Sequence, residues 1–183
     1  MAEPLQFLMA EDNPDDAELV LRALRRSGFE PAYVRVESEA EFLKSLHPGL
    51  DLVLSDFDMP QFTGLRALQL TKLHCPAVPF IIVSGTIGED TAVEAMRSGA
   101  VDYLMKDRLA RLGEAVRQAI AQGRLRRENL QAEQKMREQL AELLRWQDVM
   151  LGREDRVQHL KAEVNQLCAQ LKLPPRYGGG PPA

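Results

Sequence analysis

Short apolar runs alternate with amphipathic helical stretches between residues 5 and 122, which is typical of a parallel sheet with crossover helices. The runs are nearly continuous in hydrophobicity, as in strands that helices cover on both faces. Five strands are expected: Leu5–Ala10, Ala32–Val36, Asp51–Ser55, Val78–Val83 and Val101–Met105. The pattern therefore predicts an α/β fold with a five-stranded parallel sheet and helices on both of its faces.

Helix start and stop signals lie between these strands. Asn13 is placed to cap the first helix, and Gly28 follows the end of that helix. Ser38 and Glu41 form a capping box at the start of the second helix, and Gly99 closes the fourth. The inward-facing residues of the fifth helix are Leu112, Val116, Ala119 and Ile120.

A different pattern begins after Gly123, where Glu, Gln, Arg, Lys, Leu and Ala dominate. It predicts one long helix over residues 124–173. Apolar residues recur there at the a and d positions of a heptad repeat, namely Val157, Leu160, Val164, Leu167 and Leu171. Val at a and Leu at d favour parallel dimers, so we expect a parallel homodimer through residues 136–171.

An earlier part of this helix follows the same steps in another register, with Met136, Leu140, Leu143 and Met150. The change of register falls near Gly152, where we expect local overwinding or a break. The flanking charges give the parallel pair little support, because the positively charged Arg156 and Lys161 would lie opposite each other in it. The alternative is a helix that folds back on its own N-terminal domain.

These patterns divide the chain into three parts. We expect an α/β domain over residues 1–123, a helical coiled-coil extension over residues 124–173, and a Pro/Gly-rich tail over residues 174–183. The tail PPRYGGGPPA cannot continue a helix and is expected to be disordered.

Composition narrows the class of protein. The formal charge of −4 provides no basic face for nucleic acid. No apolar run approaches the roughly 18 residues that a membrane span needs, and the first residues lack a basic region. Cys75 and Cys168 show no metal-binding spacing and are expected to be reduced thiols. We therefore expect a soluble cytoplasmic protein that binds neither nucleic acid nor membrane.

Charged or reactive side chains follow four of the five predicted strands, at the edge where open α/β sheets bind ligands. They are Glu11 and Asp12 after the first strand, Asp56 after the third, Ser84, Gly85 and Thr86 after the fourth, and Lys106 after the fifth. Carboxylates about 4 Å apart repel by about 4 kcal/mol per pair at an effective dielectric constant of 20, so the cluster needs a cation or must take up protons. Oxygen ligands without His or Cys favour Mg²⁺.

A carboxylate can attack phosphorus and become an aspartyl phosphate. Phosphoryl transfer chiefly requires positioning and neutralised charge, which Mg²⁺ and the Lys106 ammonium would supply. Asp56 stands alone at its strand end and is the expected acceptor. Glu11 and Asp12 are adjacent and better suited to share a metal.

These residues, in DLVLSDFDMPQFTG around Asp56, PFIIVSGT around Ser84 and DYLMKD around Lys106, resemble the chemotaxis-type receiver domain of bacterial response regulators. The resemblance covers roughly the first two-thirds of the chain. It implies a flavodoxin-like sheet in the order 2-1-3-4-5, with phosphorylation of Asp56 by a histidine kinase.

The resemblance also implies roles for the surrounding residues. Mg²⁺ would be bound by Asp12, Asp56 and the backbone carbonyl of Asp58, with Glu11 helping through water. Ser84 and Gly85 would belong to the phosphate-binding switch, Lys106 would be the phosphate counter-ion, and Tyr103 would change rotamer with the switch.

The sequence departs from the family pattern after Lys106, where Asp107 replaces the proline of many receivers. This weakens the case for a cis bond and suggests a shifted start of the fifth helix. Asp58 is a second departure, and we expect its side chain to slow or reorient hydrolytic water.

The implied function is a response regulator that signals by conformational change and coiled-coil dimerisation to an unknown downstream protein, without a DNA-binding output and without being an enzyme. Residues 146–177 are similar to helical linkers beside sensory modules in sensor kinases. One alternative is therefore the N-terminal receiver portion of a larger chain of the sensor-kinase type.

The other alternative is a phosphatase, because the spacing of Asp56 and Asp58 also resembles that of haloacid-dehalogenase-like enzymes. In those enzymes the metal-binding acid pair follows the lysine, whereas Glu11 and Asp12 precede the nucleophile here. Sustained turnover of a phosphate ester would distinguish the two.

Overall fold

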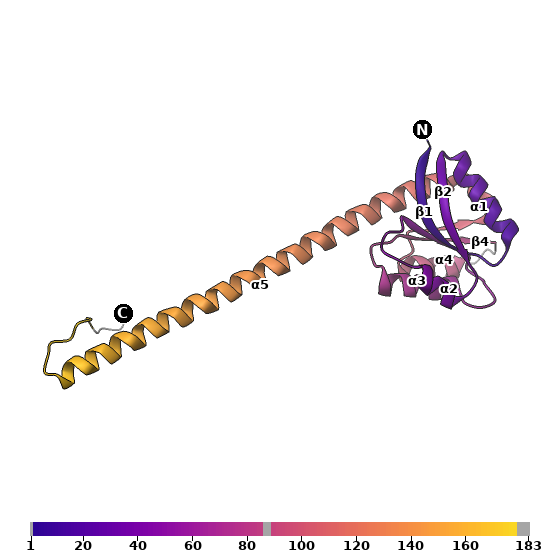
Figure 1. Ribbon diagram of the computed structural model, residues 1–183. Coiled ribbons are helices and arrows are strands. Elements are labelled where there is room, and N and C mark those ends of the chain that lie inside the picture. Colours follow the sequence, from indigo (N-terminus) through magenta and orange to yellow (C-terminus); the bar gives the residue numbers. More distant parts are fainter. Residues whose placement is uncertain (1, 86–88, 179–183) are drawn as a thin grey trace. The chain divides into compact units, whose positions relative to one another are not determined.

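The computed structural model describes residues 2–85 and 89–178. Strands and helices alternate along the chain (Figure 1). The strands are β1 (Glu3–Ala10), β2 (Phe29–Val36), β3 (Leu52–Ser55), β4 (Phe80–Ser84) and β5 (Asp102–Met105). The helices are α1 (Pro14–Arg26), α2 (Glu39–Ser45), α3 (Gly64–His74), α4 (Glu89–Ser98), the 3₁₀ helix η1 (Lys106–Arg111) and α5 (Leu112–Gln170).

Within these residues the five strands form one parallel sheet in the order β2-β1-β3-β4-β5, which confirms the predicted fold. Pairing of Ala10 with Ser55 and of Ser84 with Met105 brings the carboxyl ends of β1, β3, β4 and β5 to one edge. The strand order reverses between β1 and β3, so this edge is the expected position for a ligand.

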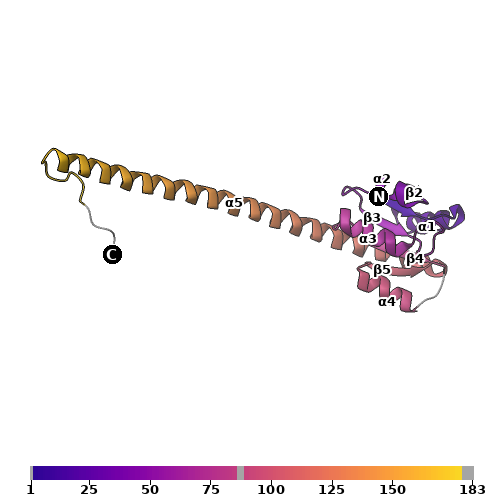
Figure 2. The same ribbon diagram turned by 90° about the horizontal axis from the view of Figure 1, so that it is seen from below.

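The sheet has a hydrophobic core on each face. Helix α1 and the first turns of α5 cover one face through residues such as Leu24 and Val116. Helices α2, α3 and α4 cover the other through Phe42, Leu68 and Ala95 (Figure 2). Because side chains alternate along a strand, the strands contribute to both cores, as their apolar runs predicted.

Several predicted helix boundaries are confirmed. The side chain of Asn13 accepts a hydrogen bond from Asp15 N at 2.9 Å, and that of Ser38 accepts one from Glu41 N at 3.3 Å. Gly28 and Gly99 have positive φ angles of 92° and 95°. Helices commonly end at a glycine in this left-handed conformation.

Strand β2 begins at Phe29, three residues before the predicted start. Pro31 lies inside this strand, although proline cannot donate to a ladder. β2 pairs only with β1 and is an edge strand, so Pro31 is tolerated there opposite Leu5. The register with β1 continues back to Glu3 and Phe29.

Helix α5 continues through Gly152, so of the overwinding or break expected there, the break is wrong. A glycine in a helix interior costs only about 1 kcal/mol relative to alanine, and its neighbours are good helix formers. Every peptide bond in the described residues is trans, including the one between Lys106 and Asp107. The 3₁₀ helix η1 precedes α5, which agrees with a shifted start of that helix.

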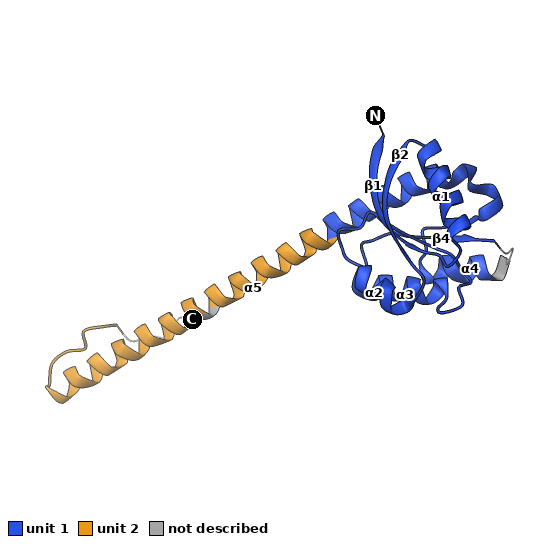
Figure 3. Cartoon of the chain, turned by 45° about the vertical axis from the view of Figure 1, so that its right-hand side comes forward, with its two compact units in different colours: residues 1–129 blue, residues 130–183 orange. Residues whose placement is uncertain are grey.

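The chain divides into two compact units, residues 1–129 and 130–183 (Figure 3). Gly123 belongs to the first unit, where a Cβ at this position would lie 2.8 Å from Pro79 Cδ. This glycine therefore permits close packing of α5 against the residues before β4.

The described part of the predicted tail, residues 174–178, contacts the end of α5. Lys172 has a φ of 55°, and its N–H and that of Leu173 donate to Ala169 O and Cys168 O, which is a Schellman ending. The Asn165 side chain accepts from the backbone N–H groups of Arg176 and Tyr177 at 2.9 and 3.0 Å and donates to Tyr177 O at 2.7 Å. We call residues 171–178 the C-terminal hook; residues 179–183 lie outside the description.

Candidate functional site

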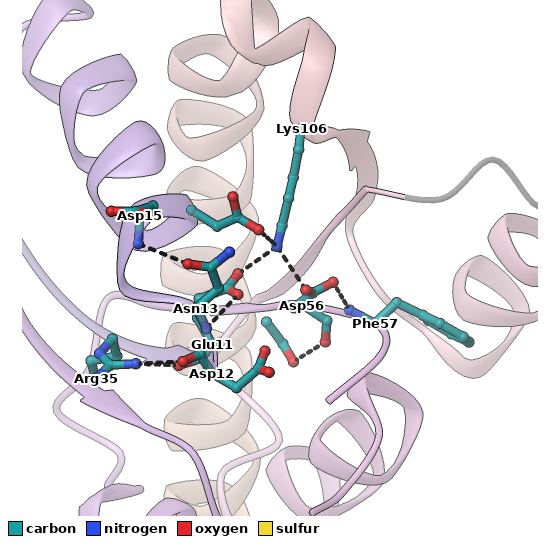
Figure 4. Close-up of polar contacts among 10 residues, drawn as sticks. Glu11, Asp12, Asn13, Asp15, Arg35, Asp56, Phe57 and Lys106 are labelled. Carbon is teal, nitrogen blue, oxygen red and sulfur yellow. Dashed lines mark hydrogen bonds and ion pairs between the residues drawn. The ribbon is translucent and has the colours of Figure 1, made fainter. Parts of the chain in front are cut away.

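The carboxyl edge of the sheet gathers an ammonium group and several carboxylates (Figure 4). Lys106 Nζ lies 2.7 Å from Asp56 Oδ2, 2.8 Å from Glu11 Oε2 and 2.6 Å from Asp16 Oδ2. The Lys106 side chain is only 12% exposed, so solvent screens these contacts little. The residues that follow three of the predicted strands, Glu11, Asp56 and Lys106, therefore meet. Asp16 joins them from helix α1.

Asp56 is fixed by its own backbone surroundings. Its Oδ1 accepts a hydrogen bond from Phe57 N at 2.6 Å, and its Oδ2 accepts one from Lys106. Ser55 Oγ donates to Asp56 O at 2.7 Å. These hydrogen bonds fix the orientation of the Asp56 carboxylate.

The start of helix α3 packs closely beneath Asp56. A Cβ on Gly64 would lie 2.5 Å from Asp56 O and 3.0 Å from Phe57 Cα, and both neighbours are backbone atoms. Gly64 N donates to Phe57 O at 2.9 Å. Only a residue without a side chain allows this approach, so Gly64 helps to set the position of Asp56.

The ionisation of Glu11 and Lys106 is altered by their surroundings. Burial raises the pKa of Glu11, and the hydrogen bond from Lys106 opposes this effect. Burial lowers the pKa of Lys106, but hydrogen bonds to Asp16, Asp56 and Glu11 outweigh it and raise the pKa above that of a free lysine. Lys106 is therefore a fixed positive charge.

Glu11, Asp12 and Asp56 could hold a metal ion. One carboxylate oxygen from each lies within 4.8 Å of the others. This set contains only carboxylate oxygens, which suits a hard cation such as Mg²⁺. Together with Asp16 the acids outnumber the single ammonium of Lys106, so the donors and the charge both fit a divalent cation.

The other predicted site residues lie around this cluster. Ser84 is buried at the end of β4 and Asp58 is exposed two positions after Asp56. A Cβ on Gly85 would lie 3.8 Å from Lys106 Cδ, which places Gly85 beside the lysine stem. Tyr103 is partly buried against the core beneath α4. Thr86 lies outside the described residues.

Sequence reasoning missed two polar residues of the site. Asp16 was not among the predicted site residues, yet its carboxylate contacts Lys106. Arg35 donates to the backbone oxygens of Glu11 and Asp12 at 2.9 and 3.2 Å and so supports the acid pair from β2. Asp16 lies in the first turn of α1, so its contact with Lys106 depends on how that helix is rotated over the sheet.

The fold and the site together define an α/β protein with an acidic cluster at the switch point of its sheet. Residues 7–117 match the family model described as the response regulator receiver domain. The chain therefore belongs to the receiver-domain family, as its motifs suggested.

One relative is the transcriptional regulatory protein ZraR of Klebsiella oxytoca, which is 33% identical over 104 residues, covering 57% of this chain and 23% of ZraR. The chain spans about a quarter of the length of the curated relatives it matches.

Solved structures agree with this fold. A response regulator receiver domain protein from Clostridium thermocellum is 25% identical with a TM-score of 0.57, covering 66% of this chain and 98% of that one. The receiver domain of the sensor histidine kinase PA1611 from Pseudomonas aeruginosa PAO1 is 22% identical with a TM-score of 0.55, covering 64% and 98%. That structure is described with a magnesium ion coordinated in its active site cleft.

In the described residues, no helix is long and apolar enough to cross a membrane.

Proposed function

We propose that this chain is a phosphoryl acceptor of a two-component system, with Asp56 as the acceptor and a histidine kinase as the donor. The observation that carries the proposal is the Asp56 carboxylate, which lies 2.7 Å from Lys106 Nζ and within 4.8 Å of Glu11 and Asp12 oxygens. Such a site combines a nucleophile, a fixed cation and a set of metal ligands.

The reaction is a displacement at phosphorus. One Asp56 oxygen attacks the phosphorus atom of phosphohistidine, the P–O bond forms and the P–N bond breaks, and the imidazole leaves with the electron pair and takes up a proton. Lys106 Nζ can then donate to the transferred phosphoryl oxygens while it stays paired with the Glu11 carboxylate. Ion pairing of this kind neutralises the charge of the transition state.

Glu11, Asp12 and Asp56, with the backbone carbonyl of Asp58, would hold Mg²⁺. The bound ion would neutralise charge on the phosphoryl oxygens. The acidic donor set supports this assignment, as does the magnesium of the PA1611 receiver.

The switch residues would convert phosphorylation into a change of conformation. Ser84 and Gly85 would contact the phosphoryl group, and Tyr103 would follow. A charge-assisted hydrogen bond to Ser84 is worth about 1.5–3 kcal/mol, whereas reversing a 1:99 population requires about 5.5 kcal/mol. Mg²⁺, Lys106 and contacts to a partner must therefore supply the rest.

The signal would leave through helix α5 to a protein partner in the cytoplasm. The formal charge of −4 supports a protein partner over nucleic acid. Helix α5 also exposes apolar residues that could pair with a second chain, as in the expected homodimer through residues 136–171.

The test uses a small phosphoryl donor, acetyl phosphate, with Mg²⁺ and intact-mass measurement. One phosphoryl group per chain is expected, and borohydride reduction should locate it at position 56. Asp56→Asn should abolish labelling, and Asp107→Asn, a matched change beside Lys106, should not. Labelling of Asp56→Asn, or sustained turnover of a phosphate ester, would contradict the proposal.

A further inference from the structure

Helix α5 exposes a row of large apolar side chains within residues 130–183. The heptad of Val157 and Leu160 extends back in one register to Trp146. Its a and d positions, which we call the seam, are Trp146, Met150, Arg153, Val157, Leu160, Val164, Leu167 and Leu171. Trp146, Met150 and Leu171 are 63, 65 and 71% exposed. α5 continues unbroken through Gly152, and Met150 occupies a seam position in this register as well as in the earlier one.

A parallel pair of seams would bring like charges together. In that orientation each seam residue faces its own copy, so Arg153 would oppose the partner's Arg153 between the helices. At the flank, Arg156 occupies a g position and would lie beside the partner's Lys161 at an e position. These contacts oppose the preference of the Val and Leu pattern for the parallel dimer.

An antiparallel pair centred between Gln158 and His159 places opposite charges together. Arg156 then lies beside the partner's Glu163, and Glu154 beside the partner's Lys161. Each contact occurs twice by symmetry. Exposed ion pairs of this kind are individually weak, but here every one of them is attractive.

The apolar residues also match in this arrangement. The facing pairs are Trp146 with the partner's Leu171, Met150 with the partner's Leu167, Val157 with the partner's Leu160, and Arg153 with the partner's Val164. Arg153 no longer meets a like charge, and its aliphatic stem can cover the valine while its guanidinium reaches water.

We propose that the seam binds a second copy of this chain in the antiparallel orientation, through residues 146–171. This pairing goes beyond the phosphoryl chemistry and does not depend on Asp56. A chain carrying Asp56→Asn should pair as the wild type does, so a failed phosphorylation test and a failed pairing test are separate results.

Charge reversal distinguishes the two orientations. Arg156→Glu puts like charges beside Glu163 in the antiparallel pair and opposite charges beside Lys161 in the parallel pair. We expect about tenfold weaker dimerisation of the full chain at low salt, because each of the two symmetric contacts changes from attraction to repulsion. Arg156→Glu combined with Glu163→Arg should restore it, and Arg145→Glu, at an outward position, should have little effect. Sedimentation equilibrium measures all four chains.

Disulfide formation gives a second, geometric test in a Cys168→Ser background, with the buried Cys75 retained. A mixture of Met150→Cys and Leu167→Cys chains should form mixed disulfides, and neither chain alone should form a linked dimer. Tighter dimerisation of Arg156→Glu, linkage of Met150→Cys to itself, or a monomer at every concentration would overturn the proposal.

Discussion

At the scale of single residues, Asp16 competes for the lysine that the phosphoryl group needs. Its carboxylate lies 2.6 Å from Lys106 Nζ, the group that would donate to the phosphoryl oxygens. We predict that Asp16→Asn raises the phosphorylated fraction several-fold at a fixed donor concentration, since one charged hydrogen bond is worth about 1.5–3 kcal/mol and Asp16 is partly exposed.

The matched control is Asp15→Asn, which removes the same charge one residue earlier on an exposed side chain. Separation of phosphorylated and free chains after equilibration with acetyl phosphate measures the fraction. Equal increases in the two variants would show a general effect of charge and would remove the specific role of Asp16.

Gly64 offers a test of how firmly Asp56 is positioned. The methyl group of Gly64→Ala would meet the backbone at Asp56 and Phe57, which cannot rotate away. We predict a loss of about 1–3 kcal/mol in the free energy of unfolding, as for other overpacked sites, together with slower phosphorylation. Urea denaturation followed by circular dichroism measures the first effect.

Gly152→Ala is the opposite case in the same chain. Nothing lies within 4 Å of a Cβ at this position, and alanine favours a helix interior. This variant should be as stable as the wild type or more so. A stable Gly64→Ala chain with normal phosphorylation would show that the contact is relieved at no cost.

The sequence predicted the site where each residue follows a strand, and failed where the contact depends on a helix. Glu11, Asp56 and Lys106 meet because parallel strands end at one edge, whatever the lengths of the connections. Asp16 reaches Lys106 from a helix, and that contact depends on the rotation of α1 over the sheet. No pattern in one sequence fixes such a rotation, because the packing of two cores determines it.

At the scale of elements, helix ends were easier to predict from local signals than strand ends. Asn13 caps α1 through its side chain and Gly28 ends it through its positive φ, and both signals are local in the sequence. The start of β2 depends on pairing with β1, and that partner lies outside any local window. At the end of α5, Lys172 occupies the position with positive φ where a glycine is usual. The sequence therefore lacked the glycine that normally indicates a Schellman ending.

The C-terminal hook depends on one side chain. Asn165 accepts hydrogen bonds from two backbone N–H groups and donates one, so we predict that Asn165→Ala removes the protection of the Arg176 and Tyr177 amides against hydrogen exchange. Asn165→Asp keeps the acceptor oxygens and loses the donor, and should retain part of the protection. Unchanged exchange in Asn165→Ala would show that the Schellman ending alone holds the hook.

At the scale of the whole molecule, the first unit extends beyond the segment that matches the family. The match ends at residue 117, whereas the compact unit continues to residue 129. Ala119 is fully buried, Ile120 packs against the same core, and Gly123 lies against Pro79. The packing of these residues indicates that the receiver needs α5 beyond the matched segment.

We predict that a chain of residues 1–129 folds and accepts phosphate as the full chain does, because Asp56, Lys106 and both cores lie within it. A chain of residues 1–117 should be less stable by about 2 kcal/mol or more, from the apolar surface exposed when Ala119 and Ile120 are removed. Thermal unfolding and labelling by acetyl phosphate compare the two chains. Equal stability of the two chains would place the end of the folded unit at residue 117. The packing of residues 118–129 would then add nothing to the free energy of unfolding.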